Sequence, residues 1–309
     1  MNYDLENFVE ISQLDPAECS ALQKILAQKE IMSMAEVIAE KAFMGKQAED
    51  VKLYNESRQL SQAWFAAAFL SFEASHRHYM SLNYPEAVWR DSMTDLKVWL
   101  RNEFRNSGVI GLGKLARPWQ VVLYRGGVTR HGRLECNSSF FYSHGDIVDP
   151  AGKTLLRNGD AVINLHIPEE GPMDMDSCSI SLKRMAKFFA ECRSDYKWQG
   201  FLCESWLLDR QLREMLPENS NIIKFQDLGF RFMLHESDDT IFRIFGYSAP
   251  DSIKNPTSLQ RNAAEFLKRG GKFFEEGIFI PRALIGEFDF DLNKLLAYNR
   301  QTYLKNSAR

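Results

Sequence analysis

Residues 160–208 constrain the fold more than any other stretch, because they read as a strand, a tight loop, a helix and a second strand. The first strand is expected at Ala161–Ile167, an apolar run rich in β-branched residues that ends before Pro168. The second strand is expected at Gly200–Leu208. Two strands joined through a helix favour a parallel pair with a right-handed crossover. The sequence therefore predicts an α/β unit in this part of the chain.

The helix of this unit has a clear start. Asp174 and Asp176 stand where a helix N-cap belongs, because a short carboxylate can accept hydrogen bonds from the unpaired amides of the first turn. Apolar residues follow at helical spacing from Cys178 to Cys192. The preceding loop, Pro168–Pro172, faces unpaired N–H groups, which suits an anionic ligand such as a pyrophosphate. Most such loops are only connections, so this pattern alone is a weak indication of function.

Length and composition exclude several classes of protein. The 309 residues leave room for about two domains. A net charge of -3 without a Lys/Arg cluster argues against a nucleic-acid partner. No run of about 18 apolar residues could span a membrane, and the acidic start Met1–Glu6 lacks the features of a signal peptide. We therefore expect a cytoplasmic protein, whose oligomeric state the sequence does not indicate.

Cysteine and histidine spacing does not favour a metal site. The five cysteines are scattered and never form a C-x-x-C pair, so we expect free, mostly buried thiols rather than disulfides or structural zinc. His76 and His78 are two residues apart on an expected helix and would point to different faces. No metal is therefore expected.

The first third of the chain is expected to be helical, from residue 5 to about residue 107. Ser57–Met80 is nearly apolar all round in its middle, which is typical of a central, buried helix. The character of the sequence changes after Gly113. We place the boundary near residue 115, with a helical domain over 1–115 and a mixed domain with a helical tail over 116–309.

The mixed part should contain several further strands and helices. Lys153–Ile167 reads as a hairpin around Asn158–Gly159, because Asn-Gly is the strongest short-range hairpin signal. Further strands are expected at Trp119–Tyr124, Ser138–His144, Asn221–Phe225, Phe230–Leu234 and Ile241–Phe245, and helices at Asp209–Leu216, Ser258–Arg269 and Leu292–Lys305.

Three segments make the chain resemble a known family: Gly159–Pro168, the helix start Gly171–Asp174, and Glu204–Asp209. The chain is similar to a bacterial two-domain GNAT-like family, with a helical N-acyltransferase-like N-terminal domain and a GNAT-like C-terminal domain. The similarity covers most of the chain. It implies an α+β fold, in which a helical N-terminal lobe packs on a GNAT-like mixed β-sheet domain with flanking helices.

The resemblance also implies an activity. Members of this family are expected to move an acyl group from acyl-CoA to an amine acceptor, a small molecule or a peptide, by direct transfer and without a metal. In GNAT enzymes the strand before the main helix splays from its neighbour, and the pantetheine arm lies in the gap. Carried over, the arm would run along Asn164, Leu165 and Ile167. The pyrophosphate would meet the helix start from Gly171 to Ser177.

One segment departs from the GNAT pattern. The usual loop is Q/R-x-x-G-x-G/A, whose glycines let the backbone approach phosphate. Here Glu169–Pro172 has a single glycine, a proline without an N–H, and two carboxylates that would repel phosphate. Asp174 and Asp176 add negative charge. The alternative is therefore a catalytically inactive GNAT-like binding or regulatory module.

Two residues are candidates for catalysis. Glu204 lies in an otherwise apolar strand, where a half-buried carboxylate with a raised pKa could deprotonate an amine. The alternative is that its side chain points outward to solvent. His166 ends its strand, where ligands collect in α/β units, and its imidazole titrates near neutral pH, so it is a plausible base. The alternative is a histidine that only makes a hydrogen bond to the backbone. Ser205 lacks the G-x-S-x-G elbow and is interpreted as structural. We expect His166 and Glu204 to face one gap between the splayed strands, near the start of the helix.

Overall fold

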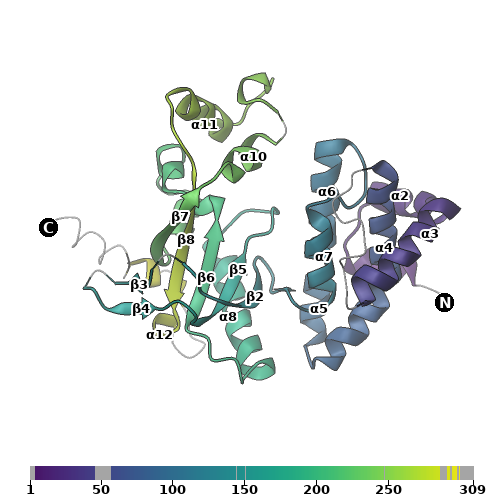
Figure 1. Ribbon diagram of the computed structural model, residues 1–309, viewed down its shortest axis with the longest axis horizontal. Helices are drawn as coiled ribbons and strands as arrows, with labels where there is room; N and C mark the ends of the chain where they lie inside the picture. Colours follow the sequence, from purple (N-terminus) through teal and green to yellow (C-terminus); the bar gives the residue numbers. More distant parts are fainter. Residues whose placement is uncertain are drawn as a thin grey trace. The chain divides into compact units, whose positions relative to one another are not determined.

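The structure is a computed structural model that describes residues 4–45, 57–143, 145–149, 151–246, 248–285, 291–292, 294–297 and 299. The chain forms two compact units (Figure 1). The first runs to His131 and includes the short segment Pro168–Glu170, and the second comprises the rest of the chain. The first unit thus extends beyond the division near residue 115 that the sequence predicts.

The first unit is built of helices around a central one. Its helices are α1 (Leu5–Ile11), α2 (Pro16–Leu26), α3 (Lys29–Ile38) with a π-helical turn (Ala39–Met44), α4 (Arg58–Ser81), α5 (Glu86–Met93), α6 (Asp95–Ser107) and α7 (Ala116–Tyr124). The two-residue strand β1 (Thr129–Arg130) ends the unit. Helix α4 is buried on every side from Ala63 to Phe72, which confirms the predicted central helix.

Helix α7 replaces a predicted strand, so the prediction of a strand at Trp119–Tyr124 is wrong. The consecutive valines Val121 and Val122 favour a strand, because β-branched residues suit a pleated backbone. Burial, however, recurs at a spacing of three to four residues, which is the period of a helix. Arg117 is fully buried in this helix and donates to the Leu112 carbonyl oxygen at 3.0 Å. Packing inside the helical unit therefore overrides the local preference.

The second unit is organised around a mixed sheet, which confirms the α+β class. Its strands are β2 (Glu135–Phe140), β5 (Ala161–His166), β6 (Gly200–Ser205), β8 (Phe274–Pro281) and β7 (Phe230–Glu236), in that spatial order. Strands β5 and β6 run parallel, and the other neighbouring pairs are antiparallel. Helix α8 (Met175–Cys192) connects β5 to β6, as predicted. Asp174 caps it by accepting from the Ser177 amide at 2.8 Å.

The predicted hairpin over Lys153–Ile167 is wrong, although its turn exists. Strand β4 (Thr154–Leu156) pairs with β3 (Ile147–Val148) in a separate small sheet, whereas β5 pairs with β2 over six residues. Gly159 adopts a positive φ of 89°, so the Asn-Gly signal reports a local reversal without fixing the strand partner. Strand β2 also begins earlier than the predicted Ser138–His144, and His144 lies outside the described residues.

Two short predicted strands are helices. The segments predicted as strands at 221–225 and 241–245 form α9 (Asn221–Gln226) and α10 (Asp239–Phe245). Periodicity cannot separate strand from helix in apolar runs this short. Ser220 caps α9, because its hydroxyl accepts from the Ile223 amide at 3.2 Å. The predicted strand at Gly200–Leu208 ends at Ser205 and continues as a 3-10 helix. Strand β8 was not predicted. The tail helix predicted over 292–305 falls mostly outside the described residues.

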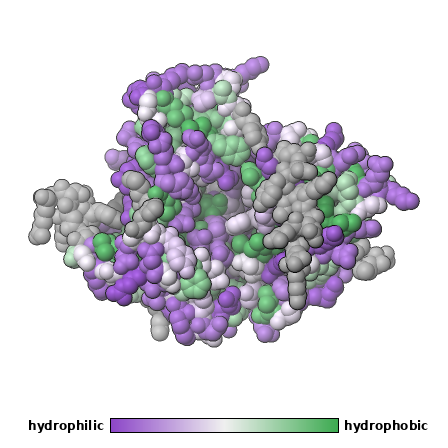
Figure 2. Space-filling model, in the orientation of Figure 1, coloured by the Kyte–Doolittle hydropathy of each residue, from purple (hydrophilic) through white to green (hydrophobic). Residues whose placement is uncertain are grey.

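A helical segment separates β7 from β8. It contains α10 and α11 (Ser258–Lys268) and shares a small core with the 3-10 helix Arg210–Glu214. That core consists of Leu212, Met215, Ile244, Phe245, Ala263 and Phe273. Apolar side chains show among polar ones on the visible surface of this segment (Figure 2). A last short helix, α12 (Arg282–Ile285), follows β8. In the described part of the chain, no helix has both the length and the apolar character needed to cross a membrane.

Candidate functional site

The two parallel strands separate at their carboxyl ends. Strand β5 pairs with β6 only from Ile163 to Leu165, and this register stops at Leu165 and Cys203. Beyond that point β5 continues along β2 to His166, and β6 continues along β8 to Ser205. The ladder between β5 and β6 therefore ends before either strand does, at the place where the family resemblance implies a gap. The carboxyl ends of parallel strands are where α/β proteins usually bind ligands.

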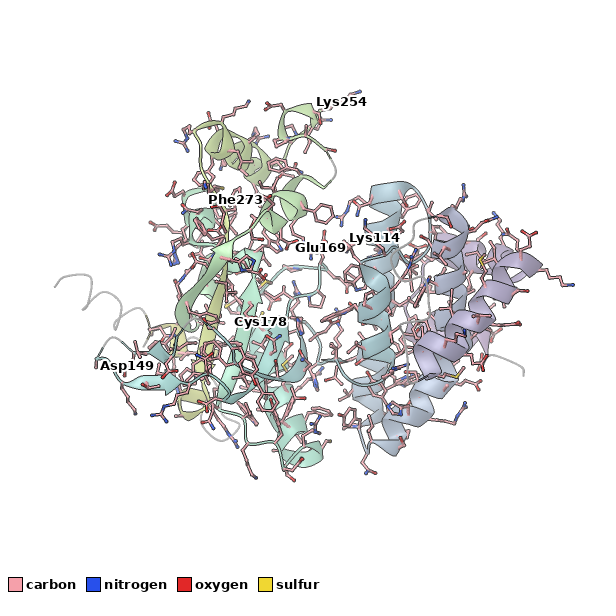
Figure 3. All side chains as sticks on the ribbon, viewed as in Figure 1. Lys114, Asp149, Glu169, Cys178, Lys254 and Phe273 are labelled. Atoms are coloured by element: carbon pink, nitrogen blue, oxygen red, sulfur yellow. The ribbon has the colours of Figure 1, made fainter. Side chains whose placement is uncertain are left out.

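The register also determines which side chains share a face of the sheet. Side chains alternate along a strand, and opposite residues share a face. Asn164, His166 and Glu204 therefore lie on one face, whereas Leu165 and Cys203 lie on the other. The Cys203 face is the one that faces helix α8, because Cys203 interacts electrostatically with Cys178, which Figure 3 labels. Burial raises the pKa of both thiols, that of Cys178 to about 12, so both stay protonated near neutral pH.

His166 contacts a side chain of the neighbouring strand. Its Nε2 lies 2.7 Å from Oδ1 of Asn137 on β2. Burial lowers the pKa of His166 to about 4, so the ring is neutral near pH 7 and is a weak base. Asn164 lies directly opposite Asn137, and its buried Oδ1 has no hydrogen-bond partner within the described residues. This geometry favours a role for His166 in lining the opening rather than in taking up a proton.

Glu204 has the environment of a base. Burial raises its pKa, the nearby carboxylate of Glu275 raises it further, and His235 acts in the opposite direction. Its neighbour across the ladder, Gly277 on β8, has no side chain, and the ring of Phe232 lies over that glycine. A half-buried carboxylate with a raised pKa is suited to take a proton from an amine.

Ser205 has a local structural contact. Its hydroxyl accepts a hydrogen bond from the Leu207 amide at 3.2 Å and caps the 3-10 turn after β6 (Trp206–Leu208). This agrees with the structural interpretation of the sequence. The neighbouring Glu204 faces the opposite side of the sheet, so the two residues are not parts of one catalytic pair.

A glycine and an arginine shape the loop before α8. Gly171 has a positive φ of 63°, and a Cβ there would meet no atom within 4 Å. Arg133 donates from Nε to the Pro172 carbonyl oxygen at 3.0 Å. Hydrogen bonds from Ser177, with a smaller contribution from Arg133, hold the pKa of Asp174 below its usual value. The Ser177 amide is therefore already engaged by the cap, and Arg133 supplies a positive charge that sequence reasoning missed.

The two carboxylates before Gly171 are paired with arginines of the first unit. Glu169, labelled in Figure 3, lies 2.6 Å from Arg105, and Glu170 lies 2.9 Å from Arg130. The Arg105 side chain is 61% exposed, whereas that of Arg130 is 9% exposed. These ion pairs offset the negative charge that the sequence placed in this loop. No His, Cys, Asp and Glu side chains cluster as metal ligands within the described residues.

Comparison with known proteins agrees with this geometry. Residues 87–279, more than half of the chain, match the family model described as "GNAT-like C-terminal domain". No curated protein matches the chain.

Solved structures share the fold at low sequence identity. An acyltransferase in complex with decanoyl-CoA is 20% identical with a TM-score of 0.69, over 89% of this chain and 86% of that one. An acyltransferase in complex with decanoyl-CoA and teicoplanin gives a TM-score of 0.70 at 18% identity, over 89% and 87%. An acyltransferase in complex with CoA and 10C-teicoplanin gives a TM-score of 0.71 at 18% identity, over 89% and 87%.

Proposed function

The chain belongs to the GNAT-like C-terminal domain family, and from this premise we propose that it transfers an acyl group from acyl-CoA directly to an amine. The observation that carries the proposal is Glu204: a half-buried carboxylate with a raised pKa beside the opening between two parallel strands. The similar solved structures hold decanoyl-CoA or CoA, which supports a thioester of CoA as the acyl donor.

The opening between β5 and β6 would receive the donor. The ladder between β5 and β6 ends at Leu165, and we place an extended pantetheine arm along residues 164–167, where that ladder ends. The loop from Gly171 and the guanidinium of Arg133 would meet the phosphates at the start of α8. Because Ser177 caps the helix with Asp174, we assign it a supporting role.

Direct transfer then needs a free amine beside the thioester. Glu204 would take a proton from the bound ammonium group, which frees the nitrogen lone pair for attack on the thioester carbon. The carbon–nitrogen bond forms, the carbon–sulfur bond breaks, and the CoA sulfur takes up the second nitrogen proton. Backbone N–H groups at this end of β5 would stabilise the thioester oxygen. His166, neutral and held by Asn137, would line the opening.

The acceptor is proposed to be an amine of a small molecule or a peptide. Two of the similar structures contain teicoplanin or its 10C form, which supports an acceptor larger than a simple metabolite. A cytoplasmic location remains part of the same proposal.

A thermal-shift series tests donor binding. The full-length protein is heated with CoA, acetyl-CoA, octanoyl-CoA and decanoyl-CoA, and with adenosine as a control that lacks the pantetheine arm. A ligand at about 100 times its Kd stabilises a protein by about 2.7 kcal/mol, so at least one acyl-CoA should raise the melting temperature clearly. If none does, the alternative of an inactive binding or regulatory module is favoured.

A pair of variants at neighbouring positions tests the base. Glu204→Gln keeps the shape of the side chain and removes its basicity, and should lower the rate of amide formation by about 10²–10⁴-fold while acyl-CoA still binds. Ser205→Ala is the matched control, because its hydroxyl only caps a turn. Loss of turnover in Ser205→Ala together with a normal rate in Glu204→Gln would overturn the assignment.

A further inference from the structure

A bulge in β7 brings a histidine opposite a carboxylate of β8. The register of β7 and β8 shifts between Met233 and His235, so that His235 lies opposite Glu275. Without the extra residue, Leu234 would occupy that position and His235 would point to the other face. His235 Nε2 lies 3.6 Å from Glu275 Oε2. Bulges often re-aim a side chain beside an active site, and this one places His235 on the Glu204 face.

The three residues form a row across neighbouring strands. Glu204 on β6 lies opposite Gly277, and Glu275 is two residues from Gly277 on the same face of β8. Diagonal neighbours of this kind are within reach of long side chains. Exposure increases from Glu275 to His235, because the Glu275 side chain is 30% exposed and the His235 side chain is 65% exposed. The row therefore leads from the opening to solvent.

We propose that Glu275 and His235 form a relay that carries the proton taken up by Glu204 to solvent. This inference rests on the proposed acyl transfer. Glu204 accepts one proton from the bound ammonium group and passes it to the Glu275 carboxylate. Glu275 passes it to the ring of His235, which releases it to water, so that all three groups return to their starting state. With the second nitrogen proton on the CoA sulfur, each turnover yields one amide, one CoA thiol and one released proton.

Other charged groups near the row have partners of their own. Glu236, next to His235, pairs with Lys272 at 2.9 Å. On the opposite face, Glu276 is fully buried and pairs with Arg210 and Arg231 at 2.6 and 2.9 Å. Across the opening, His166 is bound to Asn137, and the buried carboxylate of Glu135 lies beyond it on β2. Among the described residues, Glu204, Glu275 and His235 thus form a row of titratable groups that runs from the base towards the surface.

The relay predicts a defect that an added buffer can repair. Full-length protein is assayed with decanoyl-CoA and n-butylamine in dilute and in concentrated MOPS, a tertiary amine that can carry protons but cannot form a stable amide. His235→Ala and Glu275→Gln should each lower kcat by at least about tenfold in dilute buffer, with little change in KM. Concentrated MOPS should restore kcat for His235→Ala, because an external base replaces the exposed end of the relay.

Controls separate this relay from a structural effect and from the proposed function itself. Glu236→Gln alters the next residue along β7 and should leave kcat and its buffer dependence unchanged. A wild-type rate for His235→Ala in dilute buffer, or a loss that MOPS does not repair, would overturn the relay while wild-type turnover upholds the acyl transfer. Absence of amide formation by the wild-type protein would instead overturn the proposed function, and the relay with it.

Discussion

At the scale of single residues, His166 shows how burial decides what a side chain can do. Its position at the end of β5 can be read from the sequence, and so can its type as the side chain that titrates near neutral pH. Its partner Asn137 lies on β2, 29 positions away, and no local pattern indicates that contact. Glu275 and His235 escaped prediction for the same reason, since β8 was not predicted and a bulge sets the position of His235.

His166 should make stability depend on pH. Folding lowers the pKa of His166 from 6.5 to about 4, so between these pH values the unfolded chain binds a proton and the folded chain does not. Stability is then full above about pH 6.5 and is lost as the pH falls towards 4, by about 3 kcal/mol in total. In His166→Gln this loss between pH 6.5 and 4 should disappear. The free energy of unfolding is measured with urea at pH 7.5 and at pH 5, and His78→Gln, at an exposed histidine, is the control. An unchanged pH dependence in His166→Gln would contradict the assignment.

The adjacent glutamates before Gly171 should differ in their effect on stability. Glu170 pairs with the nearly buried Arg130, whereas Glu169 pairs with the exposed Arg105. Glu170→Gln leaves a buried cation with one partner fewer and should cost about 1–2 kcal/mol, a value reduced because Glu170 is a third exposed. Glu169→Gln should cost under about 0.5 kcal/mol. Chemical denaturation of both variants decides this, and equal costs would show that burial of Arg130 is unimportant.

At the scale of elements, local signals predicted long segments and failed for short ones. Helix α8 was predicted because its cap and its apolar period both lie within its own sequence. The runs that form α9 and α10 carry no such period; Ser220 caps α9, and the packing of buried residues stabilises α10. Strand β8 was missed because Glu275 and Glu276 interrupt an apolar run, although Glu276 is fully buried between two arginines. Tertiary pairing thus decided what local sequence could not.

Strand β6 depends on a glycine at its start. A Cβ at Gly200 would collide with the backbone oxygen of Ile280 and with the ring of Phe279 on β8. Backbone atoms cannot move aside cheaply, so Gly200→Ala should destabilise the protein by about 1–3 kcal/mol. Gly145→Ala is the matched control, because a Cβ there meets no atom within 4 Å, and it should stay within about 0.5 kcal/mol. Thermal melts of the two variants measure the difference, and a neutral Gly200→Ala would show that β6 and β8 can separate slightly.

At the scale of the whole molecule, the sequence and the structure place the C-terminal end of the helical unit at different residues. The sequence predicts a division near residue 115, whereas the first compact unit extends to His131 and includes α7. Buried polar groups of α4 bond to α7 and the segment after it. Ser75 Oγ donates to the Tyr124 carbonyl oxygen at 2.8 Å, and the Tyr79 hydroxyl donates to that of Leu123 at 2.6 Å. Buried polar groups that lose their partners cost about 1–3 kcal/mol each.

Two fragments of different length should therefore behave differently. Residues 1–131 keep α7 and its bonds to α4, and should fold alone, with a helical circular dichroism spectrum and one cooperative thermal transition. Residues 1–115 lose those bonds, leave Ser75 and Tyr79 without these partners, and expose the side of α4 that α7 covers. This shorter fragment should keep some helix but melt without cooperativity, and should bind the dye ANS. If residues 1–115 melt as sharply as residues 1–131, the domain ends where the sequence predicts, and α7 belongs to the connection.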